Sequence, residues 1–300
     1  MVHPSRIIAL IGAKGMLARK VIEHADPDDR LLLFDLPEFD ITDRSAVLNK
    51  ILEVNPDIII NCAAYTQVDQ CEVEEEFAAK VNGAGPGFLA EAAKTCDAIL
   101  VHISTDYVFS GQVEVPYRED DPTGPLSAYG RTKLIGEQAI VDSGLSRYFI
   151  IRTSWLYGPG GPNFVETILR LSSERDELRI VTDQVGSPTY TGDLAQAIFS
   201  LLKESDLIGH NLYGTYHFSN TGYCSWYEFA KEIIAQARVL GLKVVTQSIK
   251  PIATDEYPLP AVRPENSVFN KEKYQNVVGT VIPRWQDSLT QYMSERQVNN

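Results

Sequence analysis

The stretch Ile7-Ile-Ala-Leu-Ile-Gly-Ala-Lys-Gly-Met-Leu-Ala18 decides the fold of this chain. Its apolar, β-branched start predicts a buried strand over residues 7–12, and the residues after Gly15 predict a helix. Backbone N–H groups at a helix N-terminus bind phosphate, provided that no Cβ blocks the approach. Gly12 permits the turn, Gly15 permits the close approach, and Ala18 stands where a third glycine is usual. We therefore expect a dinucleotide pyrophosphate to bind at this turn.

The acidic residue that follows the next expected strand, residues 31–34, bears on which dinucleotide binds. Asp35 stands 20 residues beyond Gly15. A carboxylate at this place can bind the hydroxyls of the adenosine ribose, and it would repel a 2′-phosphate, which favours NADH. Lys14 in the glycine loop would attract that phosphate instead. The sequence therefore leaves both NADH and NADPH open as the cofactor.

Short β-rich runs and helical runs alternate through the first half of the chain. Further strands are expected at residues 57–61, 98–104 and 148–152, with helical stretches at residues 45–54, 74–94 and 128–141. Strands separated by helices favour right-handed βαβ units and a parallel sheet that is buried on both faces. The fold class expected is α/β, a Rossmann-type doubly wound parallel sheet.

The pattern loosens after about residue 155. Helical periodicity returns near residues 164–172, 194–203 and 226–240, between loops rich in Pro and Gly. This change predicts a smaller C-terminal lobe that closes one side of a cleft. We expect residues 1–155 to form mainly the NAD(P)-binding domain and residues 156–300 mainly the substrate-binding lobe, with the elements partly interleaved.

A tyrosine and a lysine four residues apart are the candidate catalytic pair. Tyr129 and Lys133 share one face of the expected helix at residues 128–141. A lysine cation near a phenol lowers the tyrosine pKa from about 10, and such a phenol can pass a proton to a carbonyl oxygen. The same spacing recurs at Tyr227 and Lys231, so spacing alone does not decide between the two pairs.

Context favours the first pair. The fourth expected strand ends in Ser104-Thr105-Asp106, and ligands of parallel sheets bind beyond the carboxyl ends of the strands. Thr105 and the start of the Tyr129 helix can therefore converge there. Tyr227 belongs to a helix of the trailing lobe, where packing is the expected role.

Composition excludes several classes of function. The net charge of −13 repels nucleic acid, and no basic patch offsets it. No apolar run reaches the ~18 residues that span a bilayer, and the start of the chain does not resemble a secretory signal. We expect a cytoplasmic protein with no membrane partner. The four cysteines and five histidines show no metal-ligand spacing, so no metal site is expected.

Nine motifs spread along nearly the whole chain carry a resemblance to a known family. They are Asn61-Cys-Ala-Ala-Tyr-Thr-Gln-Val-Asp69, Val81-Asn82, Ser104-Thr-Asp-Tyr-Val-Phe109, residues 129–137, Arg152-Thr-Ser-Trp-Leu-Tyr157, Asn163-Phe164, Asp183-Gln184, Pro188-Thr189 and Arg263-Pro264. The chain resembles the extended short-chain dehydrogenase/reductases and, among them, the dTDP-4-dehydrorhamnose reductases. The resemblance implies reduction of the C4 keto group of dTDP-4-dehydro-6-deoxy-L-mannose to dTDP-L-rhamnose by NADPH or NADH.

The resemblance also implies a role for each matching residue. Tyr129 would donate the proton, Thr105 would hydrogen-bond the keto oxygen, and Lys133 would also bind the nicotinamide ribose. Trp155 would face the sugar, and Asp106 would help to hold it. Further cofactor contacts are implied for Gly15, Met16 and Leu17 at the pyrophosphate, for Asp35, Asp40 and Ile41 at the adenosine end, and for Ala63, Ala64 and Tyr65 in the middle.

An acidic protein needs local cations to hold the diphosphate of a nucleotide sugar. Arg263 and Arg152 are the candidates, with Arg263 preferred because it lies in a Pro-rich segment of the expected substrate lobe. Either arginine could instead pair with a carboxylate. Some relatives dimerise through magnesium bound by carboxylates, one of them on the first helix. Here that stretch reads Ala18-Arg19-Lys20, so we expect no such metal, and a homodimer stays open.

Three alternatives accompany this interpretation. A sugar dehydratase would carry an acidic residue where this chain has Tyr107, which argues for plain reduction. A nucleotide-sugar epimerase would retain its NAD(H) and consume no external reductant. The third is a non-catalytic regulatory subunit resembling the methionine adenosyltransferase β subunit, whose relatives match less well at residues 152–155 and have Ser in place of Thr105.

Overall fold

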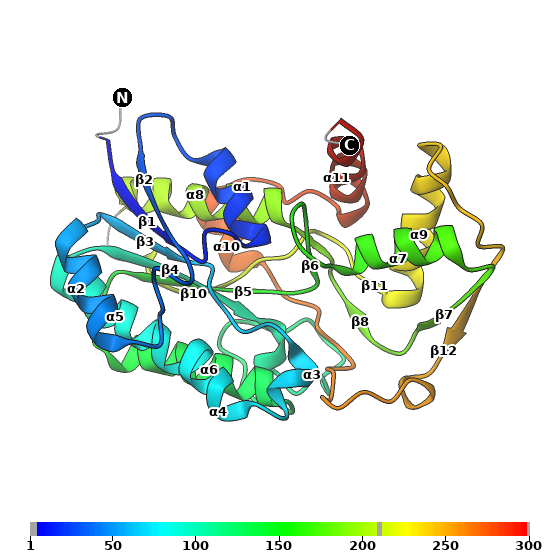
Figure 1. Ribbon diagram of the computed structural model, residues 1–300, viewed down its shortest axis with the longest axis horizontal. Helices are drawn as coiled ribbons and strands as arrows, with labels where there is room; N and C mark the ends of the chain where they lie inside the picture. Colours follow the sequence, from blue (N-terminus) through cyan, green and yellow to red (C-terminus); the bar gives the residue numbers. More distant parts are fainter. Residues whose placement is uncertain (1–4, 209–211, 299–300) are drawn as a thin grey trace.

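The structure is a computed structural model that describes residues 5–208 and 212–298. Its centre is a six-stranded sheet with the strand order β10-β5-β4-β3-β1-β2, and every neighbouring pair runs parallel (Figure 1). The strands are β1 (Ile7–Ile11), β2 (Arg30–Phe34), β3 (Ile58–Asn61), β4 (Ile99–Thr105), β5 (Tyr148–Thr153) and β10 (Gly214–His217).

Helices cover both faces of this sheet because its strands are apolar on both sides. Along β1, Ile8 and Leu10 pack into one core cluster while Ala9 and Ile11 pack into another. The first face is covered by α1 (Met16–His24), α8 (Thr191–Ile208) and α10 (Glu272–Val278), and the second by α2 (Arg44–Val54), α5 (Gly85–Cys96) and α6 (Ala128–Asp142). The Rossmann-type prediction is confirmed.

The sheet takes elements from both halves of the chain. Strand β10 pairs with β5, and helix α8 packs on α1, although both follow residue 155. We expected the helix near residues 194–203 to belong to the trailing lobe, but its apolar face, with Leu194 and Ile198, lies in the first core cluster. Strand β10 is only Gly-Thr-Tyr-His, too short and too mixed in polarity to be predicted.

The helical stretch expected around residues 74–94 is present but not uniform. Helix α4 (Glu75–Ala78) continues through a π-helical turn (Ala79–Ala84) into α5. Pro86 follows this turn and has no N–H to donate, so a regular α-helical hydrogen bond is missing there. The turn carries the fully buried Asn82, whose carbonyl packs against Gly136 of α6. The irregular turn also carries the Asn82 side chain, which binds the backbone of Tyr65 in the segment after β3.

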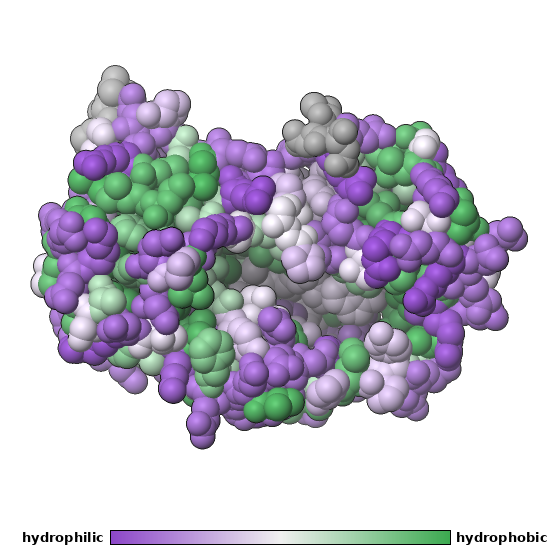
Figure 2. Space-filling model, viewed as in Figure 1, coloured by the Kyte–Doolittle hydropathy of each residue, from purple (hydrophilic) through white to green (hydrophobic). Residues whose placement is uncertain are grey.

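The remaining elements form a smaller lobe with its own core. They are β6 (Leu156–Tyr157), α7 (Phe164–Glu174), β7 (Glu177–Val181), β8 (Val185–Gly186), β9 (Thr189–Tyr190), β11 (Cys224–Ser225), α9 (Trp226–Val239), β12 (Ser248–Ile252) and α11 (Trp285–Val298). Tyr157, Phe229 and Tyr292 pack together at its centre. The surface is hollowed between the sheet and the part that carries α7 and α9 (Figure 2).

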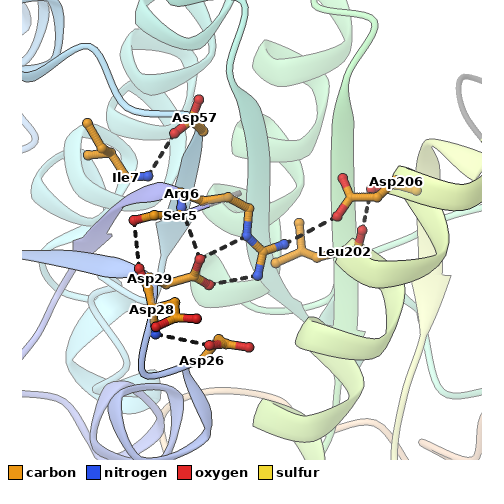
Figure 3. A network of polar contacts seen from close by, with 10 residues as sticks. Ser5, Arg6, Ile7, Asp26, Asp28, Asp29, Asp57, Leu202 and Asp206 are labelled. Carbon is orange, nitrogen blue, oxygen red and sulfur yellow. Dashed lines mark hydrogen bonds and ion pairs between the residues drawn. The ribbon is translucent and has the colours of Figure 1, made fainter. Parts of the chain in front are cut away.

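A polar network fixes the amino end of the sheet. The Arg6 guanidinium donates to both carboxylate oxygens of Asp29 and pairs with Asp206 of α8 at 3.4 Å (Figure 3). The Asp57 carboxylate accepts a hydrogen bond from the Ile7 backbone N–H at 2.7 Å. These contacts join β1, the turn before β2, the start of β3 and α8, at the end of the sheet opposite the strand carboxyl ends. Within the described ranges, no helix is both long and apolar enough to cross a membrane.

Candidate functional site

The first turn of the sheet requires glycine for two reasons. Gly12 has φ +75°, a conformation that side chains disfavour, and its N–H donates to the Phe34 carbonyl at 2.9 Å. A Cβ at this position would lie 2.7 Å from the backbone nitrogen of Ala63. The loop after β1 is therefore pressed against the segment that follows β3, as expected for a turn that receives a dinucleotide.

The N-terminus of α1 is left without a side-chain cap. Gly15 is the N-cap residue and offers no side chain, and the first turn holds no acidic residue to accept from the amides of Met16 and Leu17. These amides suit an anion, so the turn fits the pyrophosphate of a dinucleotide. The Lys14 N–H donates to Asp35 Oδ2 at 2.7 Å, and its ammonium donates to the Leu36 carbonyl. Lys14 and Asp35, which favour opposite cofactors, are direct neighbours.

Asp40 and Ile41, which are expected at the adenosine end of the cofactor, differ in how far their side chains are exposed. The Asp40 carboxylate is exposed and accepts hydrogen bonds from the backbone N–H and the hydroxyl of Thr42. The Ile41 side chain is buried against Gly85, where a Cβ would lie 2.8 Å from Ile41 Cδ1. Ile41 therefore contributes packing from its buried side chain.

Two buried amides hold the segment after β3. Asn61 Oδ1 accepts from the Ala63 N–H at 3.1 Å, and Ala64 next to it is partly exposed. Asn82 binds the Tyr65 backbone twice, since its Oδ1 accepts from the Tyr65 N–H at 2.8 Å and its Nδ2 donates to the Tyr65 carbonyl at 3.0 Å. These hydrogen bonds hold the backbone of the segment that is expected to bind the cofactor.

Tyr129 lies in the first turn of α6, which begins where the Ser127 hydroxyl accepts from the Gly130 N–H. Its phenol lies close enough to the Thr105 hydroxyl for that group to influence its pKa, and its ring packs edge-on against Tyr107 with centroids 5.4 Å apart. Burial raises the pKa of Tyr129 well above its ordinary value, so the phenol is protonated at neutral pH. The sequence predicted that Thr105 and Tyr129 lie close together, and they lie close together in the structure.

Lys133 follows one turn later and points across to β4. Its ammonium lies 2.6 Å from the Ile103 carbonyl and 3.3 Å from His102 Nε2, and burial lowers its pKa to about 8. We expected this cation to lower the pKa of Tyr129, and that expectation is wrong for this structure. Burial raises the pKa of the phenol, and the Lys133 ammonium donates to the Ile103 carbonyl of β4 instead.

Asp106 is a buried carboxylate at the end of β4. It accepts from the Thr105 hydroxyl at 2.9 Å, and burial raises its pKa to about 6. Its Oδ2 atom has no hydrogen-bond partner of good geometry within the part of the chain described here, although the Ser267 hydroxyl lies near enough to lower the Asp106 pKa. A buried, partly unsatisfied carboxylate next to Thr105 and Tyr129 is the kind of group that receives a substrate hydroxyl.

Trp155 leaves the same edge of the sheet, because Thr153 of β5 pairs with Thr105 of β4. Its backbone has φ +48°, which is strained for a residue with a side chain. The indole stacks on Trp226 at a centroid distance of 3.5 Å and rests on Gly186. Trp226 was not predicted as a site residue, because its position in an expected helix of the smaller lobe indicated a packing role.

The two arginines proposed for the diphosphate differ in their surroundings. Arg152 is buried and forms an ion pair with Glu137 at 2.7 Å, so its charge is already compensated inside the protein. Arg263 also has a carboxylate partner, since its guanidinium binds Asp69 in a two-point contact at 2.6 Å. Arg263 is the more accessible of the two and lies close enough to Tyr107 to influence its pKa.

Residues 5–208 and 212–298 contain no group of three or more His, Cys, Asp or Glu side chains that could hold a metal ion. His3 and His210 lie outside these residues. On α1, the Lys20 ammonium lies between the Glu23 and Glu295 carboxylates at 2.7 Å from each. A lysine cation thus bridges two acids on this surface, and the absence of a metal site stays a prediction.

Comparison with known proteins assigns this geometry to a family. The family model described as RmlD substrate binding domain matches residues 6–298. A spore coat polysaccharide biosynthesis protein of Bacillus subtilis is 43% identical over 85% of both chains. The dTDP-4-dehydrorhamnose reductase of Sinorhizobium fredii is 39% identical over 94% of both. A dTDP-4-dehydrorhamnose reductase of Bacillus anthracis, solved with NADP, is 41% identical, has a TM-score of 0.88, and matches over 97% of this chain and 99% of its own.

Proposed function

The chain belongs to the RmlD substrate-binding domain family, and on that premise we propose that it reduces the C4 keto group of dTDP-4-dehydro-6-deoxy-L-mannose to dTDP-L-rhamnose. The reductant is NADPH or NADH, and a similar reductase binds NADP. One observation supports the proposal most strongly. The Tyr129 phenol meets the Thr105 hydroxyl at the carboxyl edge of a parallel sheet that begins with an uncapped glycine turn.

The residues at the glycine turn fit a dinucleotide. Gly12 lets the turn approach Ala63, and the free amides of Met16 and Leu17 suit the pyrophosphate. Asp35, Asp40 and Ile41 would hold the adenosine end, with Lys14 available for a 2′-phosphate, and Ala63, Ala64 and Tyr65 would line the middle. When bound, the reduced cofactor supplies hydride.

The protein supplies the proton. Tyr129 donates it to the carbonyl oxygen, since its raised pKa keeps the phenol protonated until charge develops on that oxygen. The Thr105 hydroxyl hydrogen-bonds the same oxygen, and Lys133 would bind the nicotinamide ribose. A protonated phenol and a hydroxyl at one oxygen are the groups that reduction of a ketone requires.

The substrate would lie between the sheet and the smaller lobe. Trp155, stacked on Trp226, would face the sugar ring, and Asp106 Oδ2 would accept a sugar hydroxyl. Arg263 would bind the diphosphate either by breaking its ion pair with Asp69 or by contacting both groups at once. On this proposal, residues 156–300 mainly bind the substrate and residues 1–155 mainly bind the cofactor. Helix α8 and strand β10 follow residue 155 but belong to the core around the central sheet.

The same proposal covers partners and location. The net charge of −13 argues against nucleic acid, and we place the reaction in the cytoplasm. A homodimer would assemble without a carboxylate-bound metal, since Lys20 already lies between Glu23 and Glu295. Sedimentation velocity should then give the same mass with and without EDTA.

An absorbance assay at the NADH band tests the reaction. The purified chain should oxidise NADPH or NADH only when dTDP-4-dehydro-6-deoxy-L-mannose, made in situ, is present. Conversion of the sugar without oxidation of the cofactor would identify an epimerase instead. No conversion, together with binding to a methionine adenosyltransferase catalytic subunit, would support the regulatory alternative.

A further inference from the structure

A buried row of polar groups runs from the cofactor segment to Lys133. The Ala63 N–H donates to Asn61 Oδ1 at 3.1 Å, and Asn61 Nδ2 lies 3.1 Å from His102 Nδ1. His102 Nε2 lies 3.3 Å from Lys133 Nζ, which lies 2.6 Å from the Ile103 carbonyl. Asn61, His102 and Lys133 are each at most 1% exposed, so protein groups must satisfy one another here.

The direction of these hydrogen bonds follows from the backbone amide at one end. A backbone N–H can only donate, so Asn61 must turn its oxygen toward Ala63 and its Nδ2 toward His102. An amide NH2 can only donate as well, so His102 Nδ1 must be an unprotonated acceptor. A neutral imidazole with a bare Nδ1 carries its proton on Nε2, and that N–H faces Lys133 Nζ.

The protonated imidazolium does not fit this row. It would place an N–H on Nδ1, directly opposite the NH2 of Asn61. Burial, together with the Lys133 charge, also lowers the pKa of His102 well below its ordinary value, which agrees with a neutral ring. An ammonium has no lone pair to accept the Nε2–H, whereas a neutral amine has one.

We propose that His102 is a positioning residue that directs an N–H at Lys133 and thereby favours the neutral amine over the ammonium. This inference rests on the proposed function only where it concerns catalysis. Its structural part concerns the proton positions on His102 and Lys133, which can be measured without substrate.

The other groups around Lys133 leave this control in place. Glu137 on the same helix attracts the proton, but its carboxylate already accepts from Arg152 and Ser104. Cys62 after β3 faces Lys133 as a neutral thiol, since burial raises its pKa to about 12. Burial lowers the pKa of Lys133 itself to about 8, so its charge can change near the working pH of an enzyme.

Two variants separate the direction of the hydrogen bond from simple charge effects. Asn61→Asp is isosteric and can only accept, so it should move the His102 proton to Nδ1 and leave Nε2 as an acceptor for the ammonium. His102→Leu adds no charge and removes the N–H that faces Lys133. Both changes should raise the Lys133 pKa by about one unit, a tenfold gain in proton affinity.

NMR on the full-length protein provides the test. Nitrogen-15 shifts report which ring nitrogen of His102 carries the proton, and a titration of ¹³Cε-labelled lysines gives the Lys133 midpoint, assigned with Lys133→Arg. Lys271 is the internal control, because it is also buried with a pKa lowered to about 8 and contacts Ser219 and Asn220 instead. We expect the proton on Nε2, an upward shift of Lys133 in both variants, and no shift of Lys271.

Several results would overturn the inference. A proton on Nδ1 of His102 in the unaltered protein would do so without any variant, so failure of a variant to fold leaves the proposal testable. A rise of the Lys133 midpoint in Asn61→Asp alone would show a charge effect rather than hydrogen-bond direction. If the chain is active, the basic limb of the kcat–pH profile should also move up about one unit in His102→Leu. Inactivity toward the keto-sugar would refute the proposed function and leave the NMR result standing.

Discussion

Replacing Tyr129 with Phe removes the proposed proton donor and little else. General acid catalysis contributes about 10²- to 10⁴-fold to a rate, which corresponds to about 3 to 5 kcal/mol of transition-state stabilisation. We therefore expect kcat to fall at least a hundredfold. Thr105 keeps two partners, since it donates to Asp106 at 2.9 Å and accepts from the Tyr107 N–H at 3.2 Å. With no buried polar group orphaned, the free energy of unfolding should change by less than about 1 kcal/mol.

The assay is the oxidation of NADPH or NADH at saturating keto-sugar, with cofactor affinity measured separately by fluorescence titration. Tyr227→Phe is the matched control, because it removes a hydroxyl from the other tyrosine with a lysine four residues later. There the Lys231 ammonium lies over the Tyr227 ring, 5.3 Å from its centroid, a contact that a phenylalanine ring also provides. Cofactor affinity should stay within about twofold in both variants.

Two outcomes would refute the reasoning. A Tyr129→Phe variant with at least a tenth of the normal kcat would show that another group supplies the proton. A Tyr227→Phe variant that is inactive while correctly folded would place the chemistry in the smaller lobe.

Three further predictions concern the glycine turn, the diphosphate and pH. Gly12→Ala should lower the free energy of unfolding by about 2 kcal/mol in urea titrations, because φ is +75° and the new Cβ would meet Ala63; an unchanged midpoint would contradict this. Arg263→Gln should raise the KM for the nucleotide sugar at least tenfold with kcat nearly unchanged; an unaltered KM would assign Arg263 to Asp69 alone. His217 is buried and its pKa is lowered to about 3, so below the ordinary value of about 6.5 only the unfolded chain takes up its proton. The free energy of unfolding should therefore be about 2 kcal/mol lower at pH 5 than at pH 7 because of His217. His217→Gln should remove this difference in paired urea titrations.

Much of the fold could be predicted because each strand of the first half is apolar and bounded by polar or glycine residues. The first strand, its glycine turn and the following helix lie where the sequence placed them. Strand β10 could not be predicted, because four residues of mixed polarity become a strand only through pairing with β5. The family resemblance is confirmed by the match over residues 6–298.

The site was predictable where motif and strand end coincide, as at Thr105 and Tyr129. Its supporting residues were not, because their roles depend on which elements meet in space. Nothing local marks His102 as the neighbour of Lys133, or Trp226 as the stacking partner of Trp155. The pKa of Tyr129 was also mispredicted, since helical spacing to a lysine does not show where the lysine side chain points or how far the phenol is buried.

The most direct test of the proposed reaction is isotope transfer to the sugar. Reduced cofactor carrying deuterium at the transferable position of its nicotinamide is incubated with the protein and dTDP-4-dehydro-6-deoxy-L-mannose. NMR of the product should show dTDP-L-rhamnose with deuterium at C4 of the sugar, one for each cofactor oxidised. A rhamnose product without deuterium at C4, or a changed sugar with no cofactor oxidised, would contradict direct hydride transfer to that carbon.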